Sequence, residues 1–256
     1  MELGSRILYC DADCLAVNKL AGEAVEGAAP GMGDLPAMLV QYFAASENNS
    51  QKESPDSSEM LSVPVAVHRL DVPVTGCALF ARTSNALVFL NNAFSGKNCR
   101  PADIEETPNA GIIPLKKYYW AIVEMPGREI KPAGNLAHWI QFDSGRNKTL
   151  AFDEPGPGRK KAELAYRITG AGRNYLFIEI QLFSGRHHQI RCQLARMGLH
   201  IKGDLKYGAR RSEPNGGIRL HARSLAFPLP PDSKRITVQA DPPVMDNLWQ
   251  AFTENL

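Results

Sequence analysis

The sequence predicts an α+β fold in which a mixed, mostly antiparallel central sheet is flanked by helices. Strand-like segments outnumber helix-like ones. Most of them follow one another through polar turns, as hairpins do, instead of alternating with helices as in βαβ units. The chain has 256 residues, 44% of them hydrophobic, which is enough for a sizeable core. We therefore expect a single domain over residues 1–256.

The predicted strands combine β-branched and aromatic residues with turn residues at their ends. The first two form a hairpin within residues 6–19, around an acidic turn at Asp11 to Asp13. A second hairpin joins residues 162–169 to residues 175–183, which alternate as a half-buried strand does. The other predicted strands cover residues 63–67, 77–81, 116–124, 136–142, 225–231 and 235–240.

Four segments are predicted to be helices, and two of them place apolar residues three and four positions apart. They cover residues 35–45, 83–94, 188–197 and 244–252. Asp34 is a possible N-cap of the first, and Gly198 ends the third. Residues 46–62 hold six serines and no apolar period, so we expect an exposed loop there. Residues 95–114 are rich in Gly, Pro and acidic residues, which predicts another loop.

The composition excludes several classes of protein. No run approaches the 18 apolar residues of a membrane span. The N-terminal residues do not place a basic stretch before an apolar run, so we expect no secretory signal and a cytoplasmic location. The five cysteines form an odd set without a CxxC pair, which argues against disulfides and against a zinc ribbon. We expect reduced thiols and a monomer without an obligatory protein partner.

The charges are distributed unevenly along the chain. Residues 1–62 carry ten acidic and three basic side chains, whereas residues 158–211 carry twelve basic and three acidic ones. Clustered Lys and Arg form a phosphate-binding surface of the kind that nucleic-acid-binding proteins use, and a merely solvated face is the alternative. Five of the basic residues are expected to face phosphates, namely Lys19, Lys160, Lys161, Arg210 and Arg211.

Two short motifs concentrate the residues that could carry chemistry. His68-Arg69-Leu70-Asp71 precedes a Pro/Gly turn between two predicted strands, so Asp71 is held by a scaffold, although such a carboxylate can also cap a turn. Arg186, His187 and His188 stand at the start of a predicted helix, where free amides and the helix dipole favour anions.

A metal site was considered as an alternative use of the histidines. His187 and His188 could bind a metal with help from His68, His200 or His221. Adjacent histidines on one helical turn are expected to point apart, however, and the chain has no HxxxH pair or acid-rich partner set. We therefore expect no metal.

Five motifs together resemble the RluA family of RNA pseudouridine synthases in their order and spacing. They are HRLD at 68–71, KYYWA at 117–121, SGRHHQIR at 184–191, IKGDLKYG at 201–208 and LHA at 220–222. The lead-in from Ile7 to Gly22 is also similar, so the resemblance runs from about residue 6 to the C terminus.

The resemblance implies isomerisation of uridine to pseudouridine in ribosomal large-subunit RNA or transfer RNA, without a metal or an organic cofactor. By motif position, Asp71 matches the family's catalytic aspartate, Tyr119 the tyrosine that stacks on the target base, and Arg191 the arginine that pairs with the aspartate. Arg69 matches the arginine that enters the RNA stack as the uridine flips out. RNA binding is expected to involve Arg69, Arg186, His187, His188, Lys160, Lys161 and Lys19.

Elementary chemistry is consistent with these roles. The reaction breaks a glycosidic bond, which calls for an ionised nucleophile or base beside the ribose. An adjacent arginine favours the charged carboxylate. The base must also leave its stack, at a cost of a few kcal/mol that inserted side chains and phosphate contacts offset.

The sequence departs from the family's pattern at two positions, where Val74 replaces a usual threonine and Leu20 a usual proline. No S4-type RNA-binding domain is expected, because the N-terminal part is acidic. Asp204 and Tyr207 are expected to shape a turn. A non-catalytic RNA-binding or ribosome-assembly protein with the same fold is the main alternative, whereas a metal-dependent nuclease lacks a carboxylate cluster.

Overall fold

The computed structural model describes residues 1–47, 60–94, 115–229 and 234–256. Its strands are β1 (Ile7–Cys10), β2 (Cys14–Lys19), β3 (Glu23–Ala24), β4 (Gly33–Asp34), β5 (Met60–Ala66), β6 (Thr75–Thr83), β7 (Lys116–Glu124), β8 (Ala133–Asp143), β9 (Lys148–Phe152), β10 (Lys160–Ala171), β11 (Tyr175–Leu182), β12 (Leu220–Leu229) and β13 (Lys234–Gln239). The helices are α1 (Leu35–Glu47), α2 (Ser84–Phe94), α3 (Gln189–Arg196) and α4 (Asn247–Thr253), with 3-10 turns at Gly4–Arg6 and Leu205–Tyr207.

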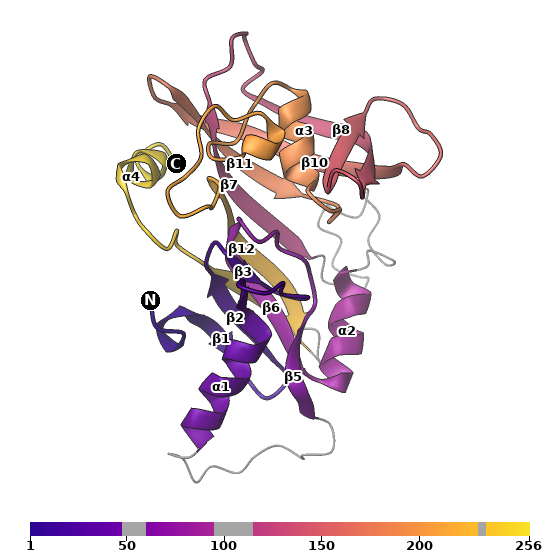
Figure 1. The fold of residues 1–256 in the computed structure, drawn as a ribbon, viewed down its shortest axis with the longest axis vertical. Coiled ribbons are helices and arrows are strands. Elements are labelled where there is room, and N and C mark those ends of the chain that lie inside the picture. Colours follow the sequence, from indigo (N-terminus) through magenta and orange to yellow (C-terminus); the bar gives the residue numbers. More distant parts are fainter. Residues whose placement is uncertain (48–59, 95–114, 230–233) are drawn as a thin grey trace.

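One sheet runs along the long axis of the molecule (Figure 1), in the order β1-β2-β6-β12-β7-β11-β10-β8-β9. Strand β5 pairs with β6, and β13 pairs with β12. Within this sheet the described pairs are antiparallel except β6 with β12, which is parallel. The predicted mixed, mostly antiparallel sheet flanked by helices is therefore confirmed.

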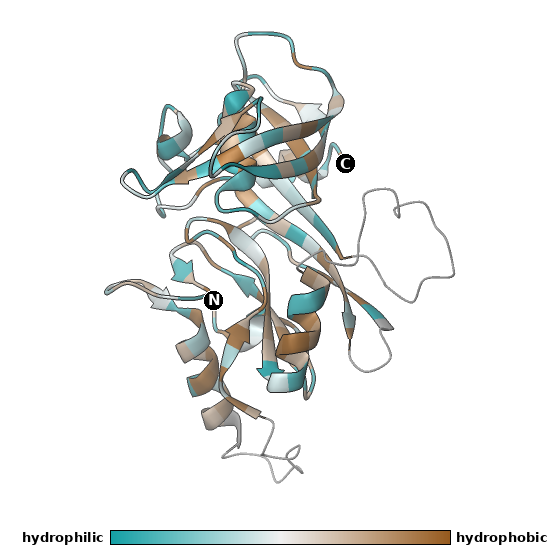
Figure 2. Ribbon diagram, turned by 90° about the vertical axis from the view of Figure 1, so that its right-hand side faces the viewer, coloured by the Kyte–Doolittle hydropathy of each residue, from teal (hydrophilic) through white to brown (hydrophobic). Residues whose placement is uncertain are grey.

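Helices cover different parts of this sheet. Helix α1 packs on β5, α2 packs on β6 and β12, and α3 packs on β8 and β9. Hydrophobic residues follow the strands and the helices (Figure 2), and the largest buried cluster joins β2, β6, β7, β11 and α3. Strands on both sides of β12 contribute to this cluster, β2 and β6 on one side and β7 and β11 on the other. The turns between these strands are therefore built on one common core.

Gly76 is required where β6 meets β12. Its φ is +112°, and a Cβ atom at this position would lie 2.3 Å from the carbonyl oxygen of Ala222. Only glycine tolerates both the conformation and the approach. This residue therefore allows the parallel pairing that brings the start of β6 beside β12 and β7.

Most of the predicted elements are present, with shifted ends. Asp34 and Thr83 accept hydrogen bonds from the first turns of α1 and α2, as N-caps do. Strand β12 begins at Leu220, five residues earlier than predicted, and β9 was not predicted at all. Both errors have one cause, because β9 and the start of β12 are made regular by pairing with a neighbouring strand.

The predicted loop at 46–62 is wrong at both ends. Helix α1 continues to Glu47. Met60 to Ser62 belong to β5, which pairs with β6. Residues 48–59 and the predicted loop at 95–114 lie outside the described part of the chain. Among the helices of the described ranges, none has the length and hydrophobicity of a transmembrane segment.

Candidate active site

Asp71 lies in the turn between β5 and β6, and a buried lysine holds this turn. The Nζ atom of Lys19 donates to the carbonyl oxygens of Val72 (3.0 Å), Val74 (2.6 Å) and Leu20 (2.9 Å). Lys19 is fully buried, and burial lowers its pKa to about 7 although Glu23 and Asp71 oppose the shift. The expectation that Lys19 faces phosphate is therefore wrong in this structure, because its ammonium group satisfies backbone carbonyls.

His68 fixes the other end of the turn. The backbone N–H of Leu79 donates to Nε2 of His68 over 3.1 Å, and the imidazole stacks on Phe94. Burial, together with a smaller contribution from the charge of Lys117, lowers the pKa of His68 to about 3. The ring is thus neutral near pH 7 and serves as a hydrogen-bond acceptor for the backbone.

Arg191 joins helix α3 to the Asp71 turn. Its Nη1 atom lies 3.0 Å from Oδ2 of Asp71, while Nε and Nη2 donate to both carboxylate oxygens of Asp204 at 2.7 and 2.8 Å. Burial opposes the arginine's charge, but the hydrogen bonds and charges of Asp204 and Asp71 outweigh it and raise the pKa of Arg191. The guanidinium is therefore a fixed cation shared by two carboxylates.

His187 and His188 lie beside Asp71 and do not point apart. His188 has a left-handed backbone (φ 50°), and its ring stacks on that of His187 at 3.8 Å between centroids. Nε2 of His188 is 3.7 Å from Oδ2 of Asp71. The expectation that adjacent histidines diverge assumed a helix, but α3 begins only at Gln189.

Tyr207 and Thr149 contact the Nδ1 atoms of the two imidazoles with their hydroxyl groups. Nδ1 of His188 lies 3.0 Å from the Tyr207 hydroxyl, and Nδ1 of His187 lies 3.1 Å from Oγ1 of Thr149. The Tyr207 hydroxyl accepts from the backbone N–H of Thr149 and donates to its carbonyl oxygen. Burial lowers the pKa of His188 to about 2, with Arg191 adding to the effect, so this imidazole is neutral at pH 7.

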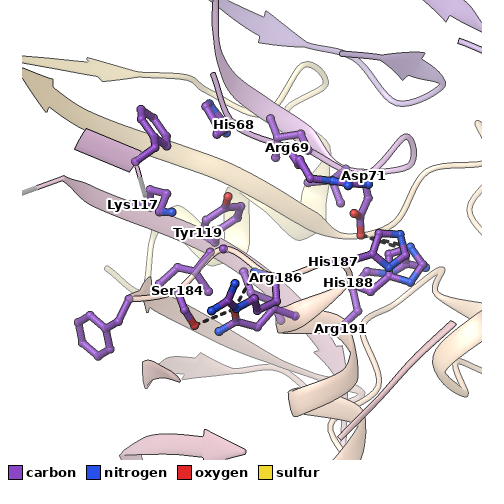
Figure 3. A pocket seen from close by; sticks show the side chains of 18 of the residues that line it. His68, Arg69, Asp71, Lys117, Tyr119, Ser184, Arg186, His187, His188 and Arg191 are labelled. Atoms are coloured by element: carbon purple, nitrogen blue, oxygen red, sulfur yellow. Dashed lines mark hydrogen bonds and ion pairs between the residues drawn. The ribbon is translucent and has the colours of Figure 1, made fainter. Parts of the chain in front are cut away.

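A cavity of about 420 Å³ lies in front of these groups (Figure 3). Asp71, Arg191 and Tyr119 all line it. Lys117, on the same strand as Tyr119, also lines it and is buried, which lowers the pKa of its ammonium group to about 8. The cavity therefore combines a carboxylate, two cations and an aromatic ring within one concave surface.

The basic residues expected to bind RNA lie in different places. Arg69 and Arg186 are exposed and line the cavity. Nε of Arg69 lies 3.7 Å from Oε1 of Glu26. Lys160 and Lys161 are exposed at the start of β10 and do not line it. They lie a few residues before Glu163, whose carbonyl oxygen accepts from the backbone of Phe183 and Ser184 at the cavity wall.

Sequence reasoning missed what four residues do at this site. Asp204 and Tyr207 lie in a turn, as predicted, but they also contact Arg191 and His188. The roles of Lys117 and Thr149 were not foreseen, although Lys117 lines the cavity and Thr149 contacts His187. The polar residues inside the IKGDLKYG motif were the only signal for Asp204 and Tyr207. Val74, which stands where the family usually has a threonine, is buried in the main hydrophobic cluster. The neighbouring hydroxyl of Thr75 lies 2.8 Å from Nδ1 of His221.

Comparison with protein families gives one match that covers most of the chain. The model of the RNA pseudouridylate synthase family matches residues 13–196. This range includes the Asp71 turn, Tyr119 and Arg191.

Three curated relatives match nearly all of this chain, and the match covers between 65% and 97% of their own length. An uncharacterized RNA pseudouridine synthase of Synechocystis sp. is 29% identical over 241 residues, which are 93% of this chain and 65% of that protein. One of Zymomonas mobilis is 28% identical over 98% of this chain and 97% of its own. Ribosomal large subunit pseudouridine synthase C of Vibrio cholerae is 27% identical over 99% of this chain and 70% of that protein.

Two solved structures share the fold. Human RNA pseudouridylate synthase domain containing 4 has a TM-score of 0.65 at 20% identity, covering 99% of this chain and 93% of that one. Human RNA pseudouridylate synthase domain containing 1 has a TM-score of 0.63 at 20% identity, covering 99% and 98%.

Proposed function

The chain belongs to the RNA pseudouridylate synthase family, and from this membership we propose that it isomerises a specific uridine of structured RNA to pseudouridine, with Asp71 as the catalytic residue. One observation supports Asp71 as the catalytic residue. Asp71 is paired with the buried Arg191 at the wall of a cavity that Tyr119 also lines. A charged carboxylate, a fixed counterion and a stacking surface are the groups that the reaction needs.

The chemistry assigns a step to each of these groups. The N1–C1′ bond breaks, the uracil ring turns, and a C5–C1′ bond forms while C5 loses a proton and N1 gains one. Asp71 acts at the ribose and base as the nucleophile or base. Arg191 pairs with this carboxylate and orients it, because its other hydrogen bonds anchor the guanidinium to Asp204. Tyr119 offers its ring to the uracil, since base stacking on an aromatic side chain contributes about 1–3 kcal/mol.

The target uridine must leave the RNA stack to reach Asp71. Arg69 is exposed at the cavity on the same turn as Asp71, so we assign it the role of entering the vacated place in the stack. Arg186 and the histidines beside it would contact the phosphates next to the flipped nucleotide. Lys160 and Lys161 extend the basic surface beyond the cavity.

The names of the relatives support ribosomal large-subunit RNA as a substrate class, because the Vibrio cholerae relative is named for it. Transfer RNA is the other substrate that we consider. We also propose that residues 1–256 act as one catalytic domain in the cytoplasm.

The test is the substitution Asp71→Asn, which keeps the size of the side chain and removes its charge. We expect loss of pseudouridine formation on ribosomal and transfer RNA from a strain that lacks the gene, measured by mass spectrometry or by site mapping. Unfolding midpoint and RNA affinity should remain close to those of the wild type. The control Asp241→Asn makes the same change in an exposed ion pair with Arg223 and should keep activity.

Three outcomes would contradict the proposal. Pseudouridine formation that survives Asp71→Asn would remove Asp71 from the chemistry. Activity that a chelator abolishes would favour a metal-dependent enzyme. RNA binding without any pseudouridine formation by the wild type would favour the non-catalytic alternative.

A further inference from the structure

We propose that Asp71, His187 and His188 form a binding site for a divalent transition-metal ion, best suited to zinc, and that the bound ion inhibits the enzyme. The binding itself is independent of the RNA chemistry. The inhibition rests on the proposed function, because it follows from occupation of the carboxylate assigned to catalysis.

The three side chains already converge. One possible ligand atom from each lies within 4.8 Å of the other two. Three such atoms are all within about 2.8 Å of a common point, and zinc bonds to imidazole nitrogen and carboxylate oxygen are about 2.0–2.2 Å, so the side chains need to close by under about 1 Å. Figure 3 shows the two imidazoles side by side, facing the Asp71 carboxylate.

The hydrogen bonds of both imidazoles leave Nε2 available. In each ring Nδ1 is the atom that faces a hydroxyl group, Tyr207 for His188 and Thr149 for His187. When the Tyr207 hydroxyl gives its single proton to the carbonyl oxygen of Thr149, Nδ1 of His188 supplies the proton of their contact. In that tautomer the lone pair of His188 is on Nε2. A hydrogen bond on the far nitrogen is also the usual way in which proteins orient metal-binding histidines.

Two atoms that can each offer a lone pair to a cation lie near each other at this point. Nε2 of His188 and Oδ2 of Asp71 are 3.7 Å apart, too far for a hydrogen bond. A cation between them would satisfy both. Two imidazole nitrogens with one carboxylate favour zinc or a similar transition metal over magnesium or calcium, and a water molecule could complete a tetrahedral set.

A cation at this site would lie near Arg191, Arg69 and Lys206, and the two arginines are paired with carboxylates. Arg191 is balanced by Asp204 on one side and Asp71 on the other. If Asp71 turned toward an ion, Arg191 would keep its two hydrogen bonds to Asp204. Arg69 is exposed and paired with Glu26, so its charge is screened by solvent. The cavity connects the site with the surface that RNA would occupy, so ion and RNA should compete.

The test measures zinc binding by calorimetry on the purified full chain without RNA. We expect one ion per chain, and cobalt in its place should give visible absorption bands of a nitrogen- and oxygen-bound ion. His187→Gln should weaken zinc binding by about tenfold or more, because Gln keeps a polar side chain but removes one ligand. Asp71→Asn should weaken it as well, which guards against a folding defect in a single variant.

Two matched controls place the ion. His138→Gln removes a histidine that lies beside one carboxylate, Asp153, without a third ligand in the described residues. Cys10→Ser removes a thiol that is exposed in the described part of the chain. Both should leave zinc affinity unchanged. Absence of saturable zinc binding would overturn the proposal, as would wild-type affinity in His187→Gln or a loss of affinity confined to a control variant.

A second measurement addresses inhibition and separates it from the proposed function. Zinc should inhibit pseudouridine formation reversibly, and EDTA should restore it. His187→Gln, with its rate expressed relative to its own rate without zinc, should need about tenfold more zinc for half-inhibition. Zinc binding without inhibition of an active enzyme would overturn the inhibitory role. A protein that binds zinc but never forms pseudouridine would instead contradict the function and leave the metal site intact.

Discussion

At the scale of single residues, the site depends on a buried carboxylate that holds an arginine. Arg191 and Asp204 are almost completely buried, at 5% and 1% side-chain exposure, whereas Asp71 is 17% exposed. The bidentate contact with Asp204 fixes the plane of the guanidinium and leaves one nitrogen for Asp71. Asp204 therefore positions Arg191 rather than acting on the substrate itself.

We predict that Asp204→Asn lowers kcat by about 10- to 100-fold, because a small displacement of Arg191 misplaces Asp71. The affinity for RNA should change little, since Asp204 is buried. The free energy of unfolding should fall by about 3 kcal/mol, because the buried arginine loses one of two counterions. Kinetics at saturating RNA and denaturant unfolding measure the two effects.

The exposed pair Arg223–Asp241 provides the control for this prediction. Asp241 is 75% exposed, so Asp241→Asn should change the free energy of unfolding by under about 0.5 kcal/mol and leave kcat unchanged. Equal kcat in wild type and Asp204→Asn would show that Asp71 alone holds Arg191 in place.

At the scale of secondary-structure elements, the contact of β6 with β12 decides where the Asp71 turn lies. This parallel pair is short, joining Thr75 to His221 and Gly76 to Ala222. Strand β7, which carries Tyr119, pairs with β12 on its other side. The distance between the carboxylate and the tyrosine is therefore set by the backbone approach at Gly76.

We predict that Gly76→Ala destabilises the protein by more than about 3 kcal/mol, because the added methyl group meets the backbone of Ala222 and the conformation is unfavourable for alanine. Denaturant unfolding followed by circular dichroism measures the change. Gly127→Ala is the control, since nothing lies within 4 Å of a Cβ atom there and its φ is not positive. It should stay within about 0.5 kcal/mol of the wild type. Similar stability of the two variants would refute the close approach at Gly76.

At the scale of the whole molecule, the basic residues of β10 distinguish one end of the sheet from the other. Strand β10 starts with Lys160 and Lys161 near the cavity wall. Its other end leads to Arg173 in the turn before β11, and Lys131 lies just before β8 at the same end. RNA bound at the cavity should therefore meet the first pair of charges and not the second.

We predict that the double variant Lys160→Glu with Lys161→Glu raises the apparent dissociation constant for RNA. The slope of log affinity against log salt concentration should become shallower by the amount that corresponds to about one to two lost phosphate contacts. The double reversal Lys131→Glu with Arg173→Glu changes the net charge equally at the opposite end, and it should have a much smaller effect. Binding measured at several salt concentrations tests both. If the two double variants behave alike, the proposed RNA path over β10 is wrong.

Much of the fold followed from local patterns. The hairpin β1–β2, strand β7 and helix α2 were predicted within a residue or two, because alternation, β-branched residues and capping are properties of neighbouring residues. Strand β9 could not be predicted, since its regularity depends on pairing with β8. The left-handed backbone at His188 was missed for a similar reason, because it interrupts an otherwise helical pattern.

The sequence by itself determined the family motifs and the hairpin-rich sheet, and the resemblance that these motifs carry implied the pairing of Asp71 with Arg191, which lie 120 residues apart. Only the tertiary structure decided that Lys19 is buried under the Asp71 turn, that Asp204 anchors Arg191, and that His187 and His188 converge. The physical reason is that burial, hydrogen-bond partners and side-chain directions depend on neighbours in space. A linear pattern records only which residues are available for those contacts.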